Sequence, residues 1–329
     1  MDNDYLVEVE NLYKLFPVRQ SFLDSLLGRK SLFLHAVDGI SFKIKEGETL
    51  GLVGESGCGK TTTGMLLTLL EKPTKGTIKF QGRNISNLNK KKKSEFRKKV
   101  QPIFQDPYES IDPRIKVLEA IIEPLIINRV GSSNDERKSM VYEMLEAVDL
   151  TPIELFIDKY PHELSGGQRQ RVAIARAMIL KPKFIIADEP ISMLDASVKV
   201  GIMNLMYRLK TEFDTTYLMI THDLSVSRYM CDRIAIMYLG VIMEIGPSEE
   251  IISDPKHPYT KMLISSVPIL DTAYQRHRTR KTGEIPIPID LPPGCRFYSR
   301  CIYSKNICKK DEPELEKIDK NHFVACHRF

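Results

Sequence analysis

The sequence lacks any long uninterrupted apolar stretch. No run of about 18 uncharged apolar residues occurs, which is the length that a membrane-spanning helix needs. The nearest candidate, residues 121–127, is interrupted by Glu123 and Pro124. The N-terminal sequence MDNDYLVEVE is acidic and contains no apolar core of a secretory signal. We therefore expect a chain that neither crosses a membrane nor is exported, and that works in a reducing, cytoplasmic setting.

Strong charge bias is also missing. The 329 residues contain 48 Lys plus Arg and 43 Asp plus Glu, a formal net charge of +5 that does not indicate a nucleic-acid partner. With 42% hydrophobic residues, the composition excludes a disordered chain, and the length suggests about two domains. The basic run at residues 89–99 has two interpretations, a solvated helix face or loop, or a contact with acidic lipid headgroups or an acidic partner.

Cysteine is scarce and unevenly placed. Six cysteines are present, of which Cys58 and Cys231 stand alone and the other four fall within the last 35 residues. These four are Cys295, Cys301, Cys308 and Cys326. In the expected reducing setting, such a cluster indicates a metal site before it indicates disulfides.

Short apolar runs alternate with helical patterns. Four runs bounded by glycine or polar residues have the character of buried parallel strands: residues 49–53, 184–188, 217–221 and 233–238. Segments with helical spacing lie between them: residues 61–70, 168–180 and 198–213. This alternation predicts an α/β fold whose sheet is covered on both faces.

The rest of the chain suggests a division into parts. Residues 106–180 are mostly helical in pattern and predict an inserted helical subdomain, with breaks at Pro107, Pro113, Pro124 and residues 131–135. A hairpin is predicted to turn at Gly240, and four prolines in residues 284–295 exclude regular helix or sheet there. We expect a first domain over residues 1–250 and a small Cys-rich C-terminal module over residues 251–329.

A phosphate-binding pattern, G-x-x-x-x-G-K-[ST], is matched by consecutive residues: Gly54, Glu55, Ser56, Gly57, Cys58, Gly59, Lys60 and Thr61. The match follows a strand-like run and opens a helical segment, which is the context that the pattern requires. Glycines allow backbone N–H groups to face phosphate oxygens. Lys60 is expected to reach the β- and γ-phosphates, Thr61 to coordinate Mg²⁺ and Thr62 to donate to a phosphate. We interpret Cys58 as a small spacer rather than a nucleophile.

A second apolar run, FIIADEP at residues 184–190, ends in two carboxylates. Asp188 can hold the Mg²⁺ shell through water, and Glu189 can polarise an attacking water. Alone, such a run is common and structural. Together with the loop at residues 54–61, it predicts a site for hydrolysis of a nucleoside triphosphate.

The segment LSGGQ at residues 164–168, continued by RQRVAIARA, resembles the signature motif of ATP-binding cassette (ABC) proteins. Other motifs of that family occur in the expected order: Gln105 in PIFQDP resembles the Q-loop glutamine, Asp195 in SMLDAS the D-loop aspartate, and His222 in MITHDL the switch histidine. Phe16 is a candidate for stacking on adenine, or else a core aromatic. The resemblance covers essentially the whole chain and implies a P-loop NTPase fold, with a RecA-like core, an antiparallel β subdomain and an inserted helical subdomain.

The family resemblance also implies how the chain works. Two cassettes associate head to tail and enclose two ATP molecules, each between the 54–62 loop of one subunit and the signature motif of the other. The residues that act in trans are Ser165, Gly166, Gly167, Gln168 and Asp195. The implied catalytic set is Glu189 as general base with His222, Gln105 and Lys60. The implied Mg²⁺ ligands are Thr61, Gln105 and Asp188.

The C-terminal part resembles the extension of ATPase subunits from dipeptide and oligopeptide importers, through KHPYT at residues 256–260, GEIPIP and LPPGCRFYSRC. This implies a peripheral ATPase on the cytoplasmic face of the membrane, paired with an identical or a sister ATPase. Two membrane-spanning permeases and, indirectly, an extracytoplasmic binding protein are the further partners. Related members move nickel or other small solutes, so the cargo rests on analogy.

The four terminal cysteines lack the tight pairs that are typical of structural zinc. Their looser spacing suits a [4Fe–4S] cluster, and some members of the peptide-importer group bind one at such cysteines. Zinc and no metal at all are the alternatives. The cluster would staple a Pro-rich tail or sense redox state.

Two other functions compete with ATP-driven import. A cassette ATPase that acts on nucleic acid or ribosomes usually carries two cassettes in one chain or long coiled coils, and this sequence has neither. A degenerate cassette retained only for assembly is disfavoured by the intact Lys60, Asp188, Glu189 and His222.

Overall fold

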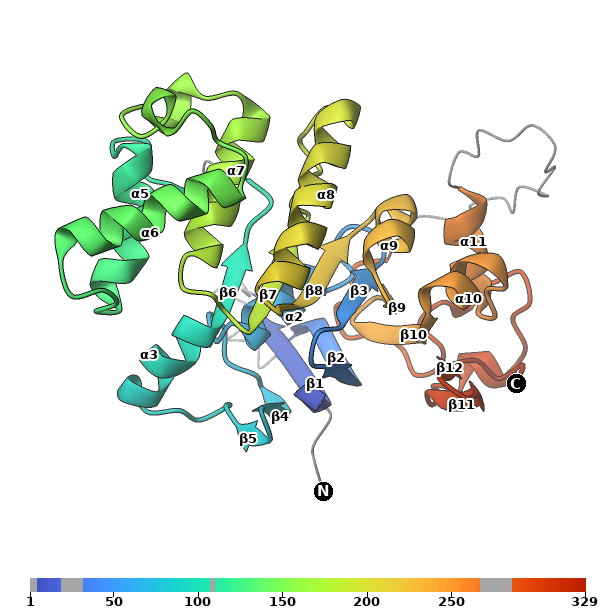
Figure 1. The fold of residues 1–329 in the computed structure, drawn as a ribbon. Helices are drawn as coiled ribbons and strands as arrows, with labels where there is room; N and C mark the ends of the chain where they lie inside the picture. Colours follow the sequence, from blue (N-terminus) through green and yellow to red (C-terminus); the bar gives the residue numbers. More distant parts are fainter. Residues whose placement is uncertain (1–4, 19–31, 107–109, 267–285) are drawn as a thin grey trace. The chain divides into compact units, whose positions relative to one another are not determined.

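The computed structural model describes residues 5–18, 32–106, 110–266 and 286–329. Figure 1 shows its helices and strands, which belong to two compact units. The first unit comprises Met1–Ile44, Thr49–Ser86 and Ile220–Phe329, and the second comprises Lys45–Glu48 and Asn87–Met219. Each unit is therefore built from segments that are distant in the sequence.

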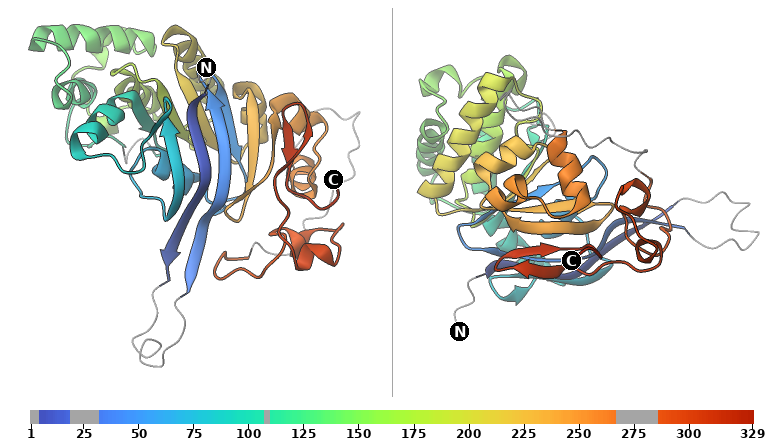
Figure 2. Two further views of the ribbon diagram at one scale, coloured as in Figure 1. Left: turned by 90° about the horizontal axis from the view of Figure 1, so that it is seen from below. Right: turned by 90° about the vertical axis from the view of Figure 1, so that its right-hand side faces the viewer.

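One sheet of the first unit has the strand order β2-β1-β4-β5. Its strands are β1 (Tyr5–Pro17), β2 (Phe33–Lys45), β4 (Lys75–Phe80) and β5 (Arg83–Asn84). The long strands β1 and β2 run side by side (Figure 2). In the antiparallel β1–β4 pair, Val9 lies opposite Ile78, and both are buried, so the apolar faces of the two strands coincide.

A second run of strands in this unit has the order β11-β12-β10-β9-β3. The strands are β3 (Thr49–Val53), β9 (Arg233–Tyr238), β10 (Val241–Pro247), β11 (Glu316–Asp319) and β12 (His322–Val324). β3 and β9 are parallel, as their continuous apolar character predicts. The predicted hairpin joins β9 to β10, and Gly240 in its turn has a φ of 85°.

Short helices complete the first unit. They are α2 (Lys60–Leu67), α9 (Leu224–Met230), α10 (Ser248–Ser253) and α11 (Pro258–Ser265), with the 3-10 turns η3 (Tyr298–Arg300) and η4 (Ile307–Lys309). α9 packs against β3, and α10 and α11 pack against β10. Residues 286–295 contain no helix or strand, in agreement with their proline content.

The expectation of a separate small C-terminal module is not confirmed. Residues 251–266 and 286–329 belong to the same compact unit as the phosphate-binding pattern. β12 pairs antiparallel with β10, where Ile245 lies opposite Phe323. This pairing satisfies the backbone groups along one edge of β10, which a separate module would leave open.

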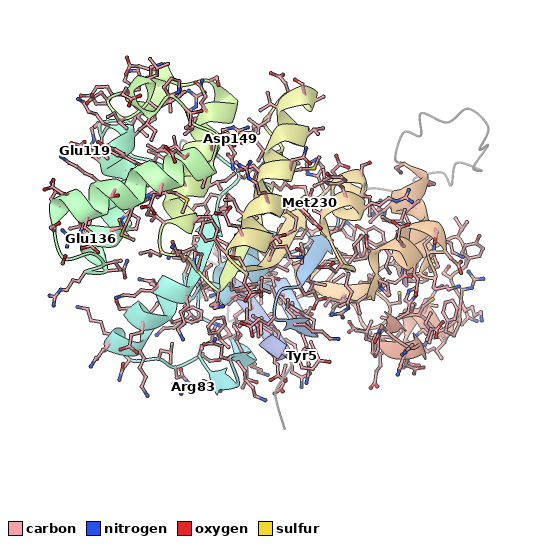
Figure 3. The ribbon with its side chains drawn as sticks, in the orientation of Figure 1. Tyr5, Arg83, Glu119, Glu136, Asp149 and Met230 are labelled. Atoms are coloured by element: carbon pink, nitrogen blue, oxygen red, sulfur yellow. The ribbon has the colours of Figure 1, made fainter. Side chains whose placement is uncertain are left out.

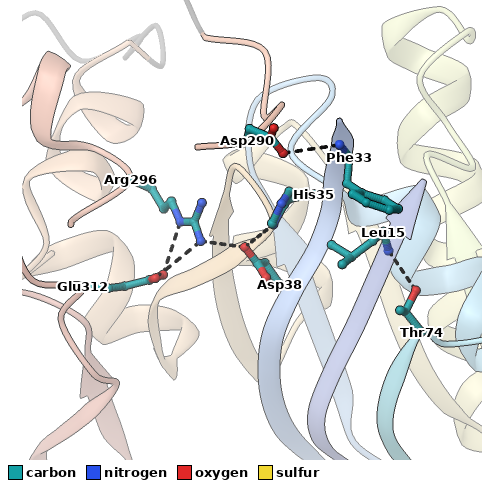
Figure 4. Close-up of polar contacts among 8 residues, drawn as sticks. All are labelled: Leu15, Phe33, His35, Asp38, Thr74, Asp290, Arg296 and Glu312. Atoms are coloured by element: carbon teal, nitrogen blue, oxygen red, sulfur yellow. Dashed lines mark hydrogen bonds and ion pairs between the residues drawn. The ribbon is translucent and has the colours of Figure 1, made fainter. Parts of the chain in front are cut away.

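A chain of charges also connects the C-terminal segment to β2 (Figure 4). Arg296 pairs with Asp38 at 2.6 Å and with Glu312 at 3.3 Å. Asp38 in turn bonds the ring of His35 at 2.9 Å. Because the Arg296 and Asp38 side chains are each only 10% exposed, this pair is better shielded from solvent than an ordinary surface ion pair.

The second unit contains the strand order β8-β7-β6, with β6 and β7 parallel. The strands are β6 (Val100–Ile103), β7 (Phe184–Asp188) and β8 (Thr216–Thr221), the last two residues of β8 falling in the first unit. The helices are α3 (Lys90–Lys99), α5 (Val117–Ile127), α6 (Asn134–Ala147), α7 (Gly166–Met178) and α8 (Ala196–Glu212), with the 3-10 turns η1 (Ile153–Leu155) and η2 (Pro161–Glu163). α5, α6 and α7 pack against one another.

Pro124 does not break the helix in which it lies, contrary to the sequence-based expectation. It is an interior residue of α5, where its missing N–H leaves the carbonyl of Ala120 without the usual helical donor. Arg176 of α7 replaces that donor, because its Nε lies 3.2 Å from the Ala120 oxygen. The helix therefore continues through Pro124. Of the two other prolines predicted as breaks, Pro113 lies in a turn before α5, as expected, and Pro107 lies outside the described residues.

The basic run at residues 89–99 forms α3, in which Phe96 is buried and most lysines face solvent.

Asp149, labelled in Figure 3, links α7 and α8 because its carboxylate pairs with Arg171 of α7 at 2.7 Å and with Arg208 of α8 at 2.8 Å.

In the part of the chain that the structure covers, no helix combines the length and the apolar character needed to cross a bilayer.

Candidate functional site

The phosphate-binding pattern forms the connection between β3 and α2, as predicted. Gly59 is the residue before α2 and has a φ of 108°. A Cβ on Gly59 would lie 2.0 Å from the Ala36 carbonyl oxygen, and one on Gly54 would lie 2.1 Å from that of Met237. Only glycine fits at either position, so the surrounding backbone fixes the path of the loop.

Lys60 points into this loop. Its ammonium donates to the carbonyl oxygens of Gly54 at 2.8 Å and Glu55 at 3.1 Å, and the residue is 6% exposed. Burial raises the pKa of Cys58, which agrees with a spacer rather than a nucleophile. Thr61 and Thr62 lie in the first turn of α2, with Thr61 exposed. The loop thus presents a cation and two hydroxyl-bearing residues at a helix N-terminus, where anions bind.

Two further predicted residues lie in the first unit. Phe16 of β1 is half-buried, and the Lys14 ammonium lies 4.7 Å from its ring centroid. His222 follows β8 directly and is exposed. The next residue, Asp223, caps α9 by accepting from Ser225 N–H at 2.8 Å, which fixes the turn that carries His222. Residues 19–31, which follow β1, lie outside the described residues.

The predicted catalytic carboxylate lies in the second unit. Asp188 ends β7, and Glu189 follows with a φ of 46°, a left-handed conformation that is uncommon for this residue type. Ser192 stabilises the turn by donating from both its N–H and its hydroxyl to the Glu189 carbonyl oxygen. Gln105 Nε2 donates to Glu189 Oε2 at 3.3 Å. The fold therefore brings together two residues that the sequence places far apart.

The predicted signature residues surround the N-terminus of α7. Ser165 is its N-cap and forms a capping box with Gln168, each side chain accepting from the other's backbone N–H. A Cβ on Gly167 would lie 2.6 Å from the Val198 side chain of α8. Asp195 is the N-cap residue of α8, so the signature motif and the aspartate lie close together in this unit.

The four C-terminal cysteines are all half-buried. Burial is the main reason that the pKa of Cys295 is raised to about 12, and Cys308, Cys326 and Cys301 act in the same direction. Cys295 N–H donates to the Cys308 carbonyl oxygen at 2.8 Å. Within residues 5–18, 32–106, 110–266 and 286–329, however, no group of three or more His, Cys, Asp or Glu is arranged to hold a metal ion.

The nearby histidines have other partners. His257 is the N-cap of α11, where its ring accepts from Tyr259 N–H at 3.0 Å, and burial lowers its pKa to about 4. His322 bonds Glu244 at 2.8 Å, and His327 bonds the Asp311 carbonyl oxygen.

Sequence reasoning missed two residues that contact the phosphate-binding loop. Arg300 pairs with Glu55 at 2.7 Å, and the Tyr259 hydroxyl accepts from Glu55 N–H at 3.1 Å. The arginine lies 245 residues from its partner, and the tyrosine 204 residues. No local pattern signals contacts over such distances.

Comparison with known proteins now identifies the family. Residues 37–192 match the family model described as ABC transporter, and residues 243–308 match that described as oligopeptide/dipeptide transporter, C-terminal region. The chain belongs to the ABC transporter ATP-binding proteins. This family is one of ATPases, and the P-loop α/β fold agrees with it.

Relatives match over nearly the full chain. The oligopeptide transport ATP-binding protein AppF of Bacillus subtilis is 46% identical, covering 100% of this chain and 98% of its own length. The dipeptide transport ATP-binding protein DppF of Haemophilus influenzae is 44% identical over 99% of this ABC protein and 97% of its own length. Among solved structures, the dimeric ATP-binding cassette MJ0796 bound to ADP and Pi has a TM-score of 0.64 and 31% identity, covering 74% of this chain and 98% of that one.

Proposed function

We propose that this chain is the ATP-hydrolysing subunit of an importer of dipeptides or oligopeptides, located at the cytoplasmic face of the membrane. The observation that carries the proposal is the presence of both family regions in one chain, the cassette at residues 37–192 and the peptide-transporter region at residues 243–308. The names of the full-length relatives support the same cargo class. Two membrane-spanning permeases complete the importer, and an extracytoplasmic binding protein delivers the peptide.

ATP binding brings two cassettes together in this proposal, and the partner is an identical or a sister chain. The solved cassette MJ0796, which is dimeric with ADP and Pi, supports such an arrangement. The phosphates lie between the 54–62 loop of one subunit and residues 164–168 of the other. The capped N-terminus of α7 suits this role because its backbone N–H groups and positive helix end favour a phosphate.

Each catalytic residue has a chemical role that fits its type. Glu189 accepts a proton from the attacking water, and Gln105, which bonds Glu189, orients the carboxylate and the water. Lys60 and His222 donate to the phosphate oxygens where charge develops, and Phe16 stacks on the adenine. Hydrolysis removes the γ-phosphate contact, so the two cassettes separate.

Mg²⁺ fits the oxygen donors that are available. The candidate ligands are the Thr61 hydroxyl, the Gln105 carboxamide and the Asp188 carboxylate, the last through water, and such oxygens are what this ion prefers. When bound with ATP, Mg²⁺ neutralises phosphate charge.

Glu189→Gln tests the assignment of the general base. The amide keeps the shape of the side chain but cannot accept the proton, so turnover is expected to fall by about 10²-fold or more. ATP binding and ATP-dependent dimerisation are expected to survive, as measured by a nucleotide titration and by gel filtration. Glu143→Gln, at an exposed position of α6, is the matched control. Turnover near the wild-type rate in Glu189→Gln would refute the assignment.

The C-terminal cysteines are proposed to hold a [4Fe–4S] cluster through Cys295, Cys301, Cys308 and Cys326. Four thiolates are the donor set that such a cluster takes, and the hydrogen bond from Cys295 N–H to the Cys308 carbonyl oxygen at 2.8 Å brings two of the four residues together. A cluster needs a wider arrangement than one ion because each thiolate binds its own iron. Zinc is the alternative, disfavoured because the four cysteines lack the tight pairs that are typical of structural zinc.

A further inference from the structure

We infer that Arg300 and Tyr259 are positioning residues for ATP binding. Arg300 neutralises the carboxylate of Glu55 in the phosphate-binding loop, and Tyr259 holds the Glu55 backbone. The inference rests on the proposed role of residues 54–62 in binding ATP. Both positioning residues come from the C-terminal segment of the first unit, which the cassette motifs do not include.

The contacts converge on one residue of the loop. Arg300 makes a two-point ion pair with the Glu55 carboxylate, with N···O distances of 2.7 and 3.1 Å. The Tyr259 hydroxyl accepts from the Glu55 backbone N–H at 3.1 Å. Side chain and backbone of Glu55 are therefore both fixed, and the Glu55 carbonyl oxygen receives the Lys60 ammonium at 3.1 Å.

The guanidinium of Arg300 is itself held by the surrounding aromatic side chains. Arg300 is 4% exposed and lies 5.6 Å from the ring centroid of Tyr238 and 5.8 Å from that of Phe297. The Tyr238 hydroxyl adds a contact at 3.3 Å. Tyr238, Tyr259 and Phe297 pack together with ring centroids 4.6 to 5.5 Å apart. This aromatic cluster fixes the guanidinium, because an arginine stacked on rings loses little freedom when it forms an ion pair.

The charge of Glu55 explains why the pairing matters for ATP. A carboxylate in a loop that binds phosphates repels the ligand, and the repulsion is strong where solvent screening is weak. The Glu55 side chain is 17% exposed, so water screens its charge only partly. Arg300 cancels this charge without occupying the loop itself. Loss of Arg300 alone would leave Glu55 uncompensated beside the phosphates.

A double-mutant cycle separates this role from simple packing. Arg300→Gln is expected to weaken binding of Mg²⁺ and a non-hydrolysable ATP analogue to the full chain by about 10-fold or more, because the uncompensated Glu55 carboxylate would repel the phosphates. A tenfold change corresponds to about 1.4 kcal/mol. In the Glu55→Gln background, the same substitution is expected to weaken binding much less, because no carboxylate is left to compensate. ATPase assays should show the effect in KM rather than in kcat.

Arg296→Gln is the matched control. Arg296 also lies beside one of the four cysteines and forms a shielded ion pair, but its partners are Asp38 and Glu312. Arg296→Gln is expected to lower the melting temperature without changing the affinity for the ATP analogue. Equal weakening by Arg300→Gln in both backgrounds would mean a merely structural role and overturn the inference, as would wild-type affinity in Arg300→Gln. Failure of the wild-type chain to bind the analogue would instead refute the proposed function.

Discussion

Glu244 is a completely buried carboxylate, and its hydrogen-bond partners come from the C-terminal segment. It accepts from the backbone N–H groups of Lys256 at 2.8 Å and His257 at 2.9 Å, and His322 Nε2 lies 2.8 Å from it. Burial disfavours the charged form of His322, but the hydrogen bond and the negative charge of Glu244 outweigh this and raise its pKa.

This shift gives the protein a pH-dependent stability. Because the folded-state pKa of His322 lies above the unfolded value of about 6.5, its stabilising contribution is complete below that pH and is lost as pH rises through the folded pKa. His322→Gln is therefore expected to lower the melting temperature more at pH 6 than at pH 8.5. His162→Gln, at an exposed position, is the control for loss of an imidazole. An equal loss at both pH values would contradict the assignment of charge to His322.

At the scale of single elements, α5 shows how a helix tolerates an internal proline. Arg176 supplies the donor that Pro124 lacks, and it also donates to the Ser110 carbonyl oxygen and pairs with Glu123. Arg176→Met should therefore destabilise the chain by about 1–3 kcal/mol, measured by urea unfolding.

Pro124→Ala provides the critical comparison for Arg176→Met. In the double variant, the new N–H of residue 124 can bond the Ala120 carbonyl oxygen, so about 1 kcal/mol of the loss should return. Arg114→Met is the control. It removes an ion pair with Asp112 in which the arginine side chain is 85% exposed, so it is expected to change stability little. Lack of any recovery in the double variant would show that Arg176 does not stabilise the chain by donating to the Ala120 carbonyl oxygen.

The elements that the sequence predicts well are those with local signals. β3 and β7 follow from continuous apolar runs, and α7 from helical spacing behind two glycines. The course of α5 through Pro124 could not be predicted, because the compensating arginine lies 56 residues from the carbonyl that it bonds. The Glu55–Arg300 pair escaped prediction for the same reason. Local sequence specifies an element, whereas distant side chains decide its exceptions.

At the scale of the whole molecule, the C-terminal segment is part of the unit that carries the phosphate-binding loop. It contributes β11 and β12 to the sheet, the Arg296–Asp38 pair and the contacts to Glu55. A [4Fe–4S] cluster at the four cysteines would therefore support the whole first unit rather than an isolated tail.

The metal content of the chain tests this view. After anaerobic purification, about four irons with matching sulfide per chain are expected, and Cys301→Ser should lose iron and melt at a lower temperature. Cys231→Ser, at a buried cysteine outside the set, is the control for loss of a thiol. About one zinc per chain without sulfide would mean that the cysteines hold a single ion rather than a cluster. A chain that contains neither iron nor zinc would refute the site.

The pairing of Glu55 with Arg300 also has a consequence during protein synthesis. The ribosome makes the loop early, but the arginine that neutralises it emerges 245 residues later, and β12 follows after that. A nascent chain that already contains every cassette motif therefore still carries an uncompensated carboxylate in its phosphate-binding loop and an unpaired edge on β10. Full affinity for ATP should arise only after translation has passed Arg300, which delays nucleotide-driven pairing of subunits until each chain is nearly complete.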